Sequence, residues 1–277
     1  MIVHLVDGTY ELFRHFFGLR RFKSEDPPLG AVGGVLGTVV DMIEDGATHI
    51  GVATDHVIES FRNELWPGYK TGAGIEPALW NQFHPLETAL AALGVAVWPM
   101  VELEADDGLA SAAHLASADE RVQKVCIWTP DKDLAQCVVS DRVVQMDRRG
   151  GEMRDASGVM AKFGVNPEHI PDYLALVGDA ADGYPGIPGI GGKTAARLIE
   201  RFGAIEDFPA ETLKGQRELA LLFKQLATLR SDALLFEDVD DLRWNGPTEK
   251  FAAVADAIGS ARLTKRVAKL AKARNAG

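Results

Sequence analysis

Residues 2–8 read IVHLVDG, a short apolar run that ends directly in an aspartate and a glycine. IGVATD at 50–55 and VCIWTPD at 125–131 repeat this arrangement. Short runs that are rich in valine and isoleucine are typical of buried β-strands. By this criterion we predict five strands, near residues 2–6, 50–53, 95–98, 124–128 and 142–146.

The segments between these runs carry apolar residues at helical spacing, and they predict helices near 9–19, 32–45, 77–93, 105–118 and 132–139. An alternation of strands and helices is typical of a mostly parallel sheet flanked by helices. After about residue 160 only helical patterns remain, near 168–177, 192–202, 216–229, 248–257 and 262–274. The sequence therefore predicts an α/β domain over residues 1–165 and a helical domain over residues 166–277.

The composition, 47% hydrophobic and 25% charged over 277 residues, is typical of a soluble globular protein. No apolar run approaches the roughly 20 residues of a membrane helix, and the N-terminus lacks the features of a signal peptide. Cys126 and Cys137 lie in apolar surroundings without the neighbours of a zinc site. We therefore expect a cytoplasmic protein, with buried cysteines and no membrane partner.

Three of the predicted strands deliver an aspartate to the same edge of the sheet, because Asp7, Asp55 and Asp131 follow their carboxyl ends. Ligands of open parallel sheets collect beyond this edge. Taken alone, Asp7 is as typical of a turn, and Asp55 of a loop cap, as of a ligand, and Asp131 is more typical of a helix cap. The three together predict a functional site.

Further acidic residues stand at predicted helix ends. EADD at 104–107 places three carboxylates at a helix start, which is more than one cap requires. GDAADG at 178–183 places two aspartates after a helix end, where the helix dipole disfavours anions unless a cation is near. Hard cations such as Mg²⁺ prefer oxygen ligands, and a pair about 4 Å apart can stabilise phosphoryl displacement. The further candidates are Glu104, Asp106, Asp107, Asp133, Asp179 and Asp182.

The formal net charge of −11 at first disfavours a nucleic-acid partner, for which a basic patch is usual. The objection weakens if many of the acids are metal ligands, because bound divalent cations make such a site far less repulsive to phosphate.

The stretch 184–199, YPGIPGIGGKTAARLI, predicts a tight hairpin between two helices. It is not a nucleotide-binding P-loop, because Ile187 occupies the position of that motif's first glycine. Gly189 and Gly191 would let backbone N–H groups approach a phosphate, and Lys193 and Thr194 would add polar donors. Such a hairpin binds the backbone of a nucleic acid without contacting its bases. A purely structural helix hairpin is the alternative.

Together these motifs resemble the 5′ nuclease family, which includes the 5′-nuclease domain of bacterial DNA polymerase I, phage 5′ nucleases and flap endonucleases. LVDG, SFRNELWPGYK, EADD, TPDKDLAQ and GDAADGYPGIPGIGGKTAARLI follow the family order within residues 1–230. The resemblance implies a stand-alone 5′-3′ exonuclease or flap endonuclease with a PIN-like or resolvase-like catalytic domain. It also implies two or more Mg²⁺ or Mn²⁺ ions, a monomer, and DNA that carries a 5′ flap, a nick or a single-stranded 5′ end.

The resemblance also implies roles for individual residues. Lys70, in an arch over the site, would act in catalysis with Asp7 and Asp107. Phe13 would stack near the 5′-terminal nucleotide, unless it is a core aromatic. Arg14 and Arg62 would contact phosphates, unless they are solvated surface residues. The hairpin would hold K⁺ through the backbone carbonyls of Ile187 and Ile190. The implied metal ligands are Asp7, Asp55, Glu104, Asp106 and Asp107 in one cluster and Asp131, Asp133, Asp179 and Asp182 in a second.

The sequence departs from the family pattern at Ala73, where an arginine is common. A junction-binding protein without strong catalysis is therefore the alternative function, and a related nuclease acting on RNA is a further one. A phosphatase with an aspartyl nucleophile is disfavoured, because Thr9 stands where its second aspartate is needed.

Overall fold

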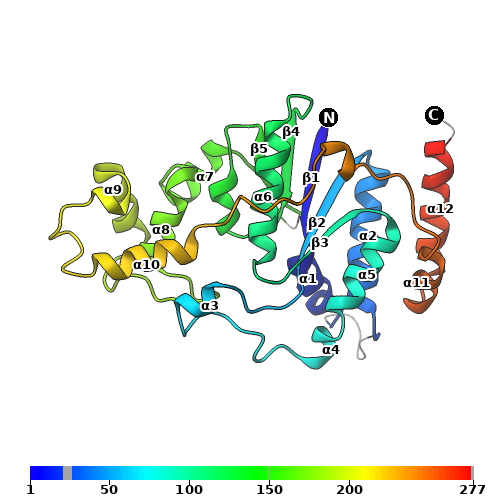
Figure 1. Ribbon diagram of the computed structural model, residues 1–277, viewed down its shortest axis with the longest axis horizontal. Helices are drawn as coiled ribbons and strands as arrows, with labels where there is room; N and C mark the ends of the chain where they lie inside the picture. The colour runs from blue at the N-terminus through cyan, green and yellow to red at the C-terminus, as the bar shows by residue number, and fades with distance from the viewer. Residues whose placement is uncertain (21–26, 149, 276–277) are drawn as a thin grey trace.

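The computed structural model describes residues 1–20, 27–148 and 150–275. Its centre is one sheet in the order β3-β2-β1-β4-β5-β6 (Figure 1). The five predicted strands all form and pair in parallel, whereas the short β6 is antiparallel and was not predicted. The strands are β1 (Ile2–Asp7), β2 (His49–Asp55), β3 (Ala96–Met100), β4 (Lys124–Trp128), β5 (Val143–Asp147) and β6 (Glu152–Arg154).

Helices cover both faces of this sheet, as alternating apolar positions of the strands require. On β1, Val3 and Leu5 belong to the core beneath α6 (Ala105–Ala118), and Val6 faces the opposite core. That opposite core is built with α1 (Gly8–Arg20), α2 (Gly30–Glu44) and α5 (Phe83–Leu93). The predicted α/β class is confirmed.

Two predicted helices differ in detail. The segment predicted as one helix over 77–93 forms α4 (Pro77–Trp80) and α5, with Gln82 between them. The Gln82 side chain accepts hydrogen bonds from the N–H groups of Ala31 and Val32 at the start of α2, so the break fixes one helix against another. The segment predicted over 132–139 is the short 3₁₀ helix η1 (Asp133–Cys137).

The second part of the chain is helical, as predicted, and lies at one end of the molecule (Figure 1). Its core combines Leu174 and Phe223 with Trp66 and Tyr69, which come from the long segment after β2. That segment contains α3 (Arg62–Leu65). The other elements are α7 (Ala156–Phe163), η2 (Pro167–His169), α8 (Ile170–Val177), α9 (Gly192–Phe202), η3 (Ile205–Asp207) and α10 (Arg217–Ala227).

The last helices return to the α/β part. After η4 (Val239–Leu242), the helices α11 (Phe251–Ala257) and α12 (Ala261–Asn275) lie beside α2 and α5 at the opposite end from α9 (Figure 1). Trp244 and Val267 are buried in the same core as these helices. The predicted division assigns all of 166–277 to the helical domain, whereas α11 and α12 pack on the α/β part. In the described part of the chain, no helix is long and apolar enough to span a bilayer.

Candidate metal and nucleic-acid site

The first acids lie where β1 and β2 end. The carboxylate of Asp7 accepts hydrogen bonds from the Tyr10 N–H at 2.8 Å and from Thr129 Oγ1 at 3.1 Å. Asp55 Oδ1 accepts one from the N–H of Ala105 at 2.8 Å, which attaches the start of α6 to the same sheet edge. These bonds fix the carboxylates and bring Glu104 and Asp106 to them.

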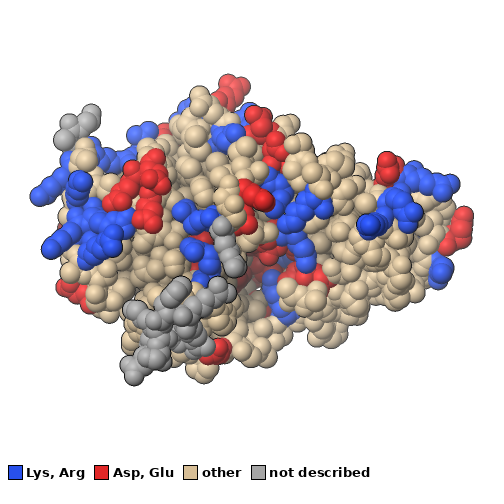
Figure 2. Space-filling view, turned by 180° about the vertical axis from the view of Figure 1, so that it is seen from behind, with Lys and Arg blue, Asp and Glu red and all other residues tan. Residues whose placement is uncertain are grey.

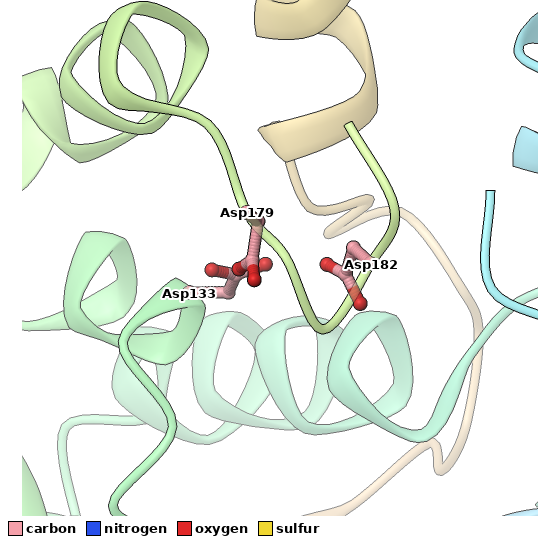
Figure 3. A group of neighbouring side chains, drawn as sticks. All are labelled: Asp133, Asp179 and Asp182. Carbon is pink, nitrogen blue, oxygen red and sulfur yellow. The ribbon is translucent and has the colours of Figure 1, made fainter. Parts of the chain in front are cut away.

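Three further carboxylates gather between η1 and the turn after α8 (Figure 3). Asp133, Asp179 and Asp182 each have one oxygen within 4.8 Å of the others. The turn is tight, because a Cβ on Gly178, which has a φ of +83°, would lie 2.4 Å from the carbonyl carbon of Pro185. Asp133 Oδ1 is buried and has no hydrogen-bond partner among the described residues. A buried carboxylate oxygen left in this state fits a cation ligand.

The two groups of acids are close enough to affect each other's ionisation. Burial, together with the charges of Asp55 and Asp131, raises the pKa of Asp7 to about 7. Burial and the charges of Asp131 and Asp7 raise the pKa of Asp106. Burial raises the pKa of Asp133, and Asp131 contributes next. Such a set of buried carboxylates favours bound protons or cations.

Lysines partly neutralise this charge. Lys70 Nζ lies 2.6 Å from Glu104 Oε2 and 3.0 Å from Asp182 Oδ1, so it connects the two groups of acids. Burial disfavours its charged form, but Glu104 and Asp182 raise the pKa of Lys70. Lys132 Nζ lies 2.6 Å from Asp179 Oδ2. Lys132 was not among the predicted site residues, although its place between Asp131 and Asp133 was a signal.

These pKa shifts predict an unusual pH dependence of stability. The free carboxylates of an unfolded chain titrate near pH 4, but Asp7, Asp106, Asp133 and Asp182 titrate higher when folded. These four acids therefore bind more protons in the folded than in the unfolded chain between about pH 4 and pH 7, and their contribution to stability falls as the pH rises through this window.

His4 and His15, whose pKa burial lowers to about 4, contribute to stability with the opposite sign over the same range. We therefore expect the gain in melting temperature caused by millimolar Mg²⁺, measured by calorimetry against the same protein in EDTA, to grow between about pH 5 and pH 7, because the cation compensates the ionised carboxylates. A gain that stays constant or shrinks over this range would contradict the assignment.

Arg62 and Asp107 occupy a different environment from the one predicted. Both side chains are buried, and Arg62 Nη1 and Nη2 lie 2.7 Å from the two oxygens of Asp107. Asp107 also accepts hydrogen bonds from the N–H groups of Glu104 and Arg230. The prediction that Arg62 contacts phosphates is therefore wrong for this conformation. Asp107, predicted as a metal ligand and catalytic residue, has both oxygens engaged within the protein.

Phe13 and Arg14 are also engaged with the protein. The ring of Phe13 is half-buried, and its centroid lies 6.0 Å from that of Phe83. The guanidinium of Arg14 forms an ion pair with Glu11 and remains partly exposed. Their contacts with DNA stay predictions.

The predicted hairpin joins α8 to α9 and is open to solvent. Apart from the neighbouring residues, no atom of the described chain lies within 4 Å of a Cβ added at Gly189 or Gly191, and Lys193 is exposed. Thr194 lies in the first turn of α9. The carbonyl of Ile187 accepts a hydrogen bond from the N–H of Ile190 within the turn. K⁺ binding by the carbonyls of Ile187 and Ile190 stays a prediction.

Relatives of this sequence are named DNA polymerase I or 5′-3′ exonuclease. The chain is 35% identical to a DNA polymerase I of Pseudomonas aeruginosa, over 91% of this chain and 29% of that protein. It is 32% identical to a 5′-3′ exonuclease of Aquifex aeolicus, over 86% of this chain and 83% of that protein. The chain thus spans about three tenths of the polymerase relatives and most of the exonuclease.

Solved structures share the fold. The T5 D15 protein co-crystallised with metal ions matches 98% of this chain and 99% of its own, with a TM-score of 0.67 and 18% identity. The catalytic core of Rad2 in complex with DNA substrate matches 96% of this chain and 91% of its own, with a TM-score of 0.63 and 14% identity.

Family models cover most of the chain. Residues 2–164 match the 5′-3′ exonuclease N-terminal resolvase-like domain, and residues 165–250 match the 5′-3′ exonuclease C-terminal SAM fold. The chain therefore belongs to the 5′-3′ exonuclease family.

Proposed function

We propose that this protein hydrolyses DNA phosphodiester bonds near 5′ ends or flap junctions and depends on Mg²⁺ or Mn²⁺. The observation that carries the proposal is the convergence of buried carboxylates, with Asp133 Oδ1 buried and without a hydrogen-bond partner in the part of the chain that the structure describes. A protein that only bound DNA would have no need for acids that destabilise one another and repel phosphate.

The available ligands are all oxygens, as Mg²⁺ and Mn²⁺ prefer. Bound there, two such cations would supply an activated water and stabilise charge on the attacking and leaving oxygens. Lys70 Nζ, between the two groups, is placed to donate to a phosphate oxygen on which negative charge develops. The proposed ligands are Asp7, Asp55, Glu104 and Asp106 in one group and Asp131, Asp133, Asp179 and Asp182 in the other.

The distribution of charge supports a DNA substrate. On one face, acidic and basic side chains lie together in the middle, and further basic side chains gather toward both of its ends (Figure 2). α9 places Lys193, Arg197 and Arg201 at exposed positions next to the hairpin. A phosphate backbone held at the hairpin would thus be kept beside acids that it would otherwise avoid. K⁺ at the hairpin carbonyls would strengthen this contact.

The test is a panel of 5′-labelled DNA substrates that includes a flap, a nick and a single strand. We expect cleavage of the flap near its junction in Mg²⁺ or Mn²⁺, and none in EDTA. Ca²⁺ provides a condition for measuring binding separately. Tight binding to the flap without any cleavage in Mg²⁺ or Mn²⁺ would favour the alternative of a junction-binding protein. The alanine at position 73, where an arginine is common in the family, permits this alternative.

Lys193→Ala tests the hairpin. We expect duplex affinity in Ca²⁺ to fall several-fold, and the slope of log affinity against log salt to decrease by about 0.9, because one phosphate contact is lost. The rate of cleavage at saturating DNA should change little. Lys250→Ala, an exposed lysine before α11 at the other end of the molecule, is the matched control. Equal effects of the two substitutions would defeat the assignment.

A further inference from the structure

Arg62 and Asp107 form a buried ion pair beside the proposed metal ligands, with side-chain exposures of 1% and 0%. The guanidinium bonds both Asp107 oxygens at 2.7 Å and Glu104 Oε1 at 3.1 Å. It also donates to the carbonyls of Leu226 at 2.8 Å and Thr228 at 3.2 Å. An arginine has five N–H donors in a fixed fork, and these five contacts match them in number.

The pair joins three segments that are distant in the sequence. Arg62 lies in α3, Asp107 in the first turn of α6, and residues 226–230 form the end of α10 and the segment directly after it. Asp107 accepts a hydrogen bond from the N–H of Arg230 at 2.8 Å. Gln136 reinforces the attachment, because its side chain donates to the Ala227 carbonyl at 2.9 Å and accepts from the Leu229 N–H at 3.0 Å.

The segment that the pair holds connects the hairpin to the site. Phe223 of α10 packs in the same core as Tyr184 and Ile187 of the hairpin region, with a Tyr184–Phe223 centroid distance of 5.4 Å. The end of α10 is then fixed by Arg62 to Asp107, directly beside Glu104. The spacing between hairpin and carboxylates is thus set in part by this ion pair.

We propose that Arg62 and Asp107 are positioning residues that fix the distance from the DNA-gripping hairpin to the metal-binding carboxylates, and so select the bond that is cut. This inference rests on the proposed function. It assigns Asp107 to a role through Arg62 and Glu104, not to metal ligation, because each Asp107 oxygen already accepts two hydrogen bonds.

The decisive variant is the double substitution R62M/D107L. Removing one partner would leave a buried charge alone, whereas an apolar pair of similar volume can replace a buried ion pair. We expect the double variant to retain Mg²⁺-dependent cleavage, with half-saturation within about threefold of wild type. Its cuts in a 5′-flap substrate should spread over neighbouring bonds, where the wild type cuts mainly one.

Asp106→Asn is the comparison for a metal ligand, since the carboxylate of Asp106 accepts no hydrogen bond from the described residues, and this variant should lose cleavage. If R62M/D107L loses cleavage and cation binding as Asp106→Asn does, Asp107 is a ligand and the proposal is overturned. A double variant that cuts only the wild-type bond also overturns it. A wild-type protein that cuts no flap would instead contradict the proposed function.

Arg62→Lys gives a second route that keeps the buried charge. A single ammonium cannot reach both carbonyls and both Asp107 oxygens, so products should again spread while the Mg²⁺ dependence stays unchanged. Thermal unfolding monitored by circular dichroism verifies the fold. Arg121→Lys, which alters a surface arginine paired with Asp119, Asp238 and Asp240, is the matched control and should give the wild-type product pattern. A wild-type pattern for Arg62→Lys as well would count against the proposal.

Discussion

Replacement of Asp133 by asparagine is expected to reduce phosphodiester cleavage by about a thousandfold or more, while the protein stays folded. The substitution removes the negative charge from the only member of the Asp133–Asp179–Asp182 group with an oxygen that is buried and unpartnered in the described chain. Loss of about 4 kcal/mol of transition-state stabilisation through a cation corresponds to this factor. Single-turnover cleavage of a 5′-labelled flap at saturating Mg²⁺ measures it.

The Asp133→Asn variant should be more stable than the wild type, although its cleavage activity is lower. Burial and neighbouring acids raise the pKa of Asp133, so the neutral asparagine relieves repulsion in the folded protein. We expect the free energy of unfolding in EDTA at neutral pH to increase by about 1 kcal/mol, which corresponds to a melting temperature higher by a few degrees.

Asp172→Asn is the matched control, since Asp172 is a buried acid of α8 that pairs with Lys224 outside the site. That variant should be less stable and fully active. Near-normal cleavage by Asp133→Asn, or a lower melting temperature in EDTA, would contradict the ligand role.

Replacement of Lys70 by methionine is expected to lower kcat by about 10²- to 10³-fold with a smaller change in KM, as for the loss of one donor to a developing negative charge. Lys70 is half-buried and contacts both groups of acids through Glu104 and Asp182. Methionine keeps most of the aliphatic volume, so the change is chiefly one of charge.

Lys132→Met provides the comparison for Lys70. Lys132 has similar exposure and a similar ion pair, at 2.6 Å, but among the described acids it pairs with Asp179 alone. We expect an effect below about tenfold, because Lys132 does not stand between the two groups. Steady-state kinetics of flap cleavage separates the cases. Equal losses for the two variants would mean that Lys70 acts by general neutralisation of the acids, and not on the scissile phosphate.

The sequence predicted the sheet and its acidic edge because both depend on local patterns. Strand runs in which valine and isoleucine recur marked β1, β2 and β4, and the aspartates at or just beyond their ends had to share one edge once the strands were parallel. Strand β6 has three residues, too few to show a period, and its antiparallel pairing with β5 depends on a turn.

The features that the sequence did not predict depend on contacts between residues that are distant in the sequence. The sequence EADD contains three carboxylates. Only the structure shows that Arg62 and the N–H of Arg230 donate hydrogen bonds to the Asp107 carboxylate, whereas the Asp106 carboxylate accepts none from the described residues. In the same way, the apolar residues of α11 and α12 indicate helices without indicating which core they join. Trp244 and Val267 place them on the α/β part.

The most direct test of the account is a crystal structure with Mn²⁺ and its anomalous difference map. The account predicts ions about 2 Å from carboxylate oxygens of Asp133, Asp179 or Asp182 and of Asp7, Asp55 or Asp106, with Asp107 still bonded to Arg62. A map without ions among these acids, at Mn²⁺ concentrations that support cleavage, would contradict the central claim.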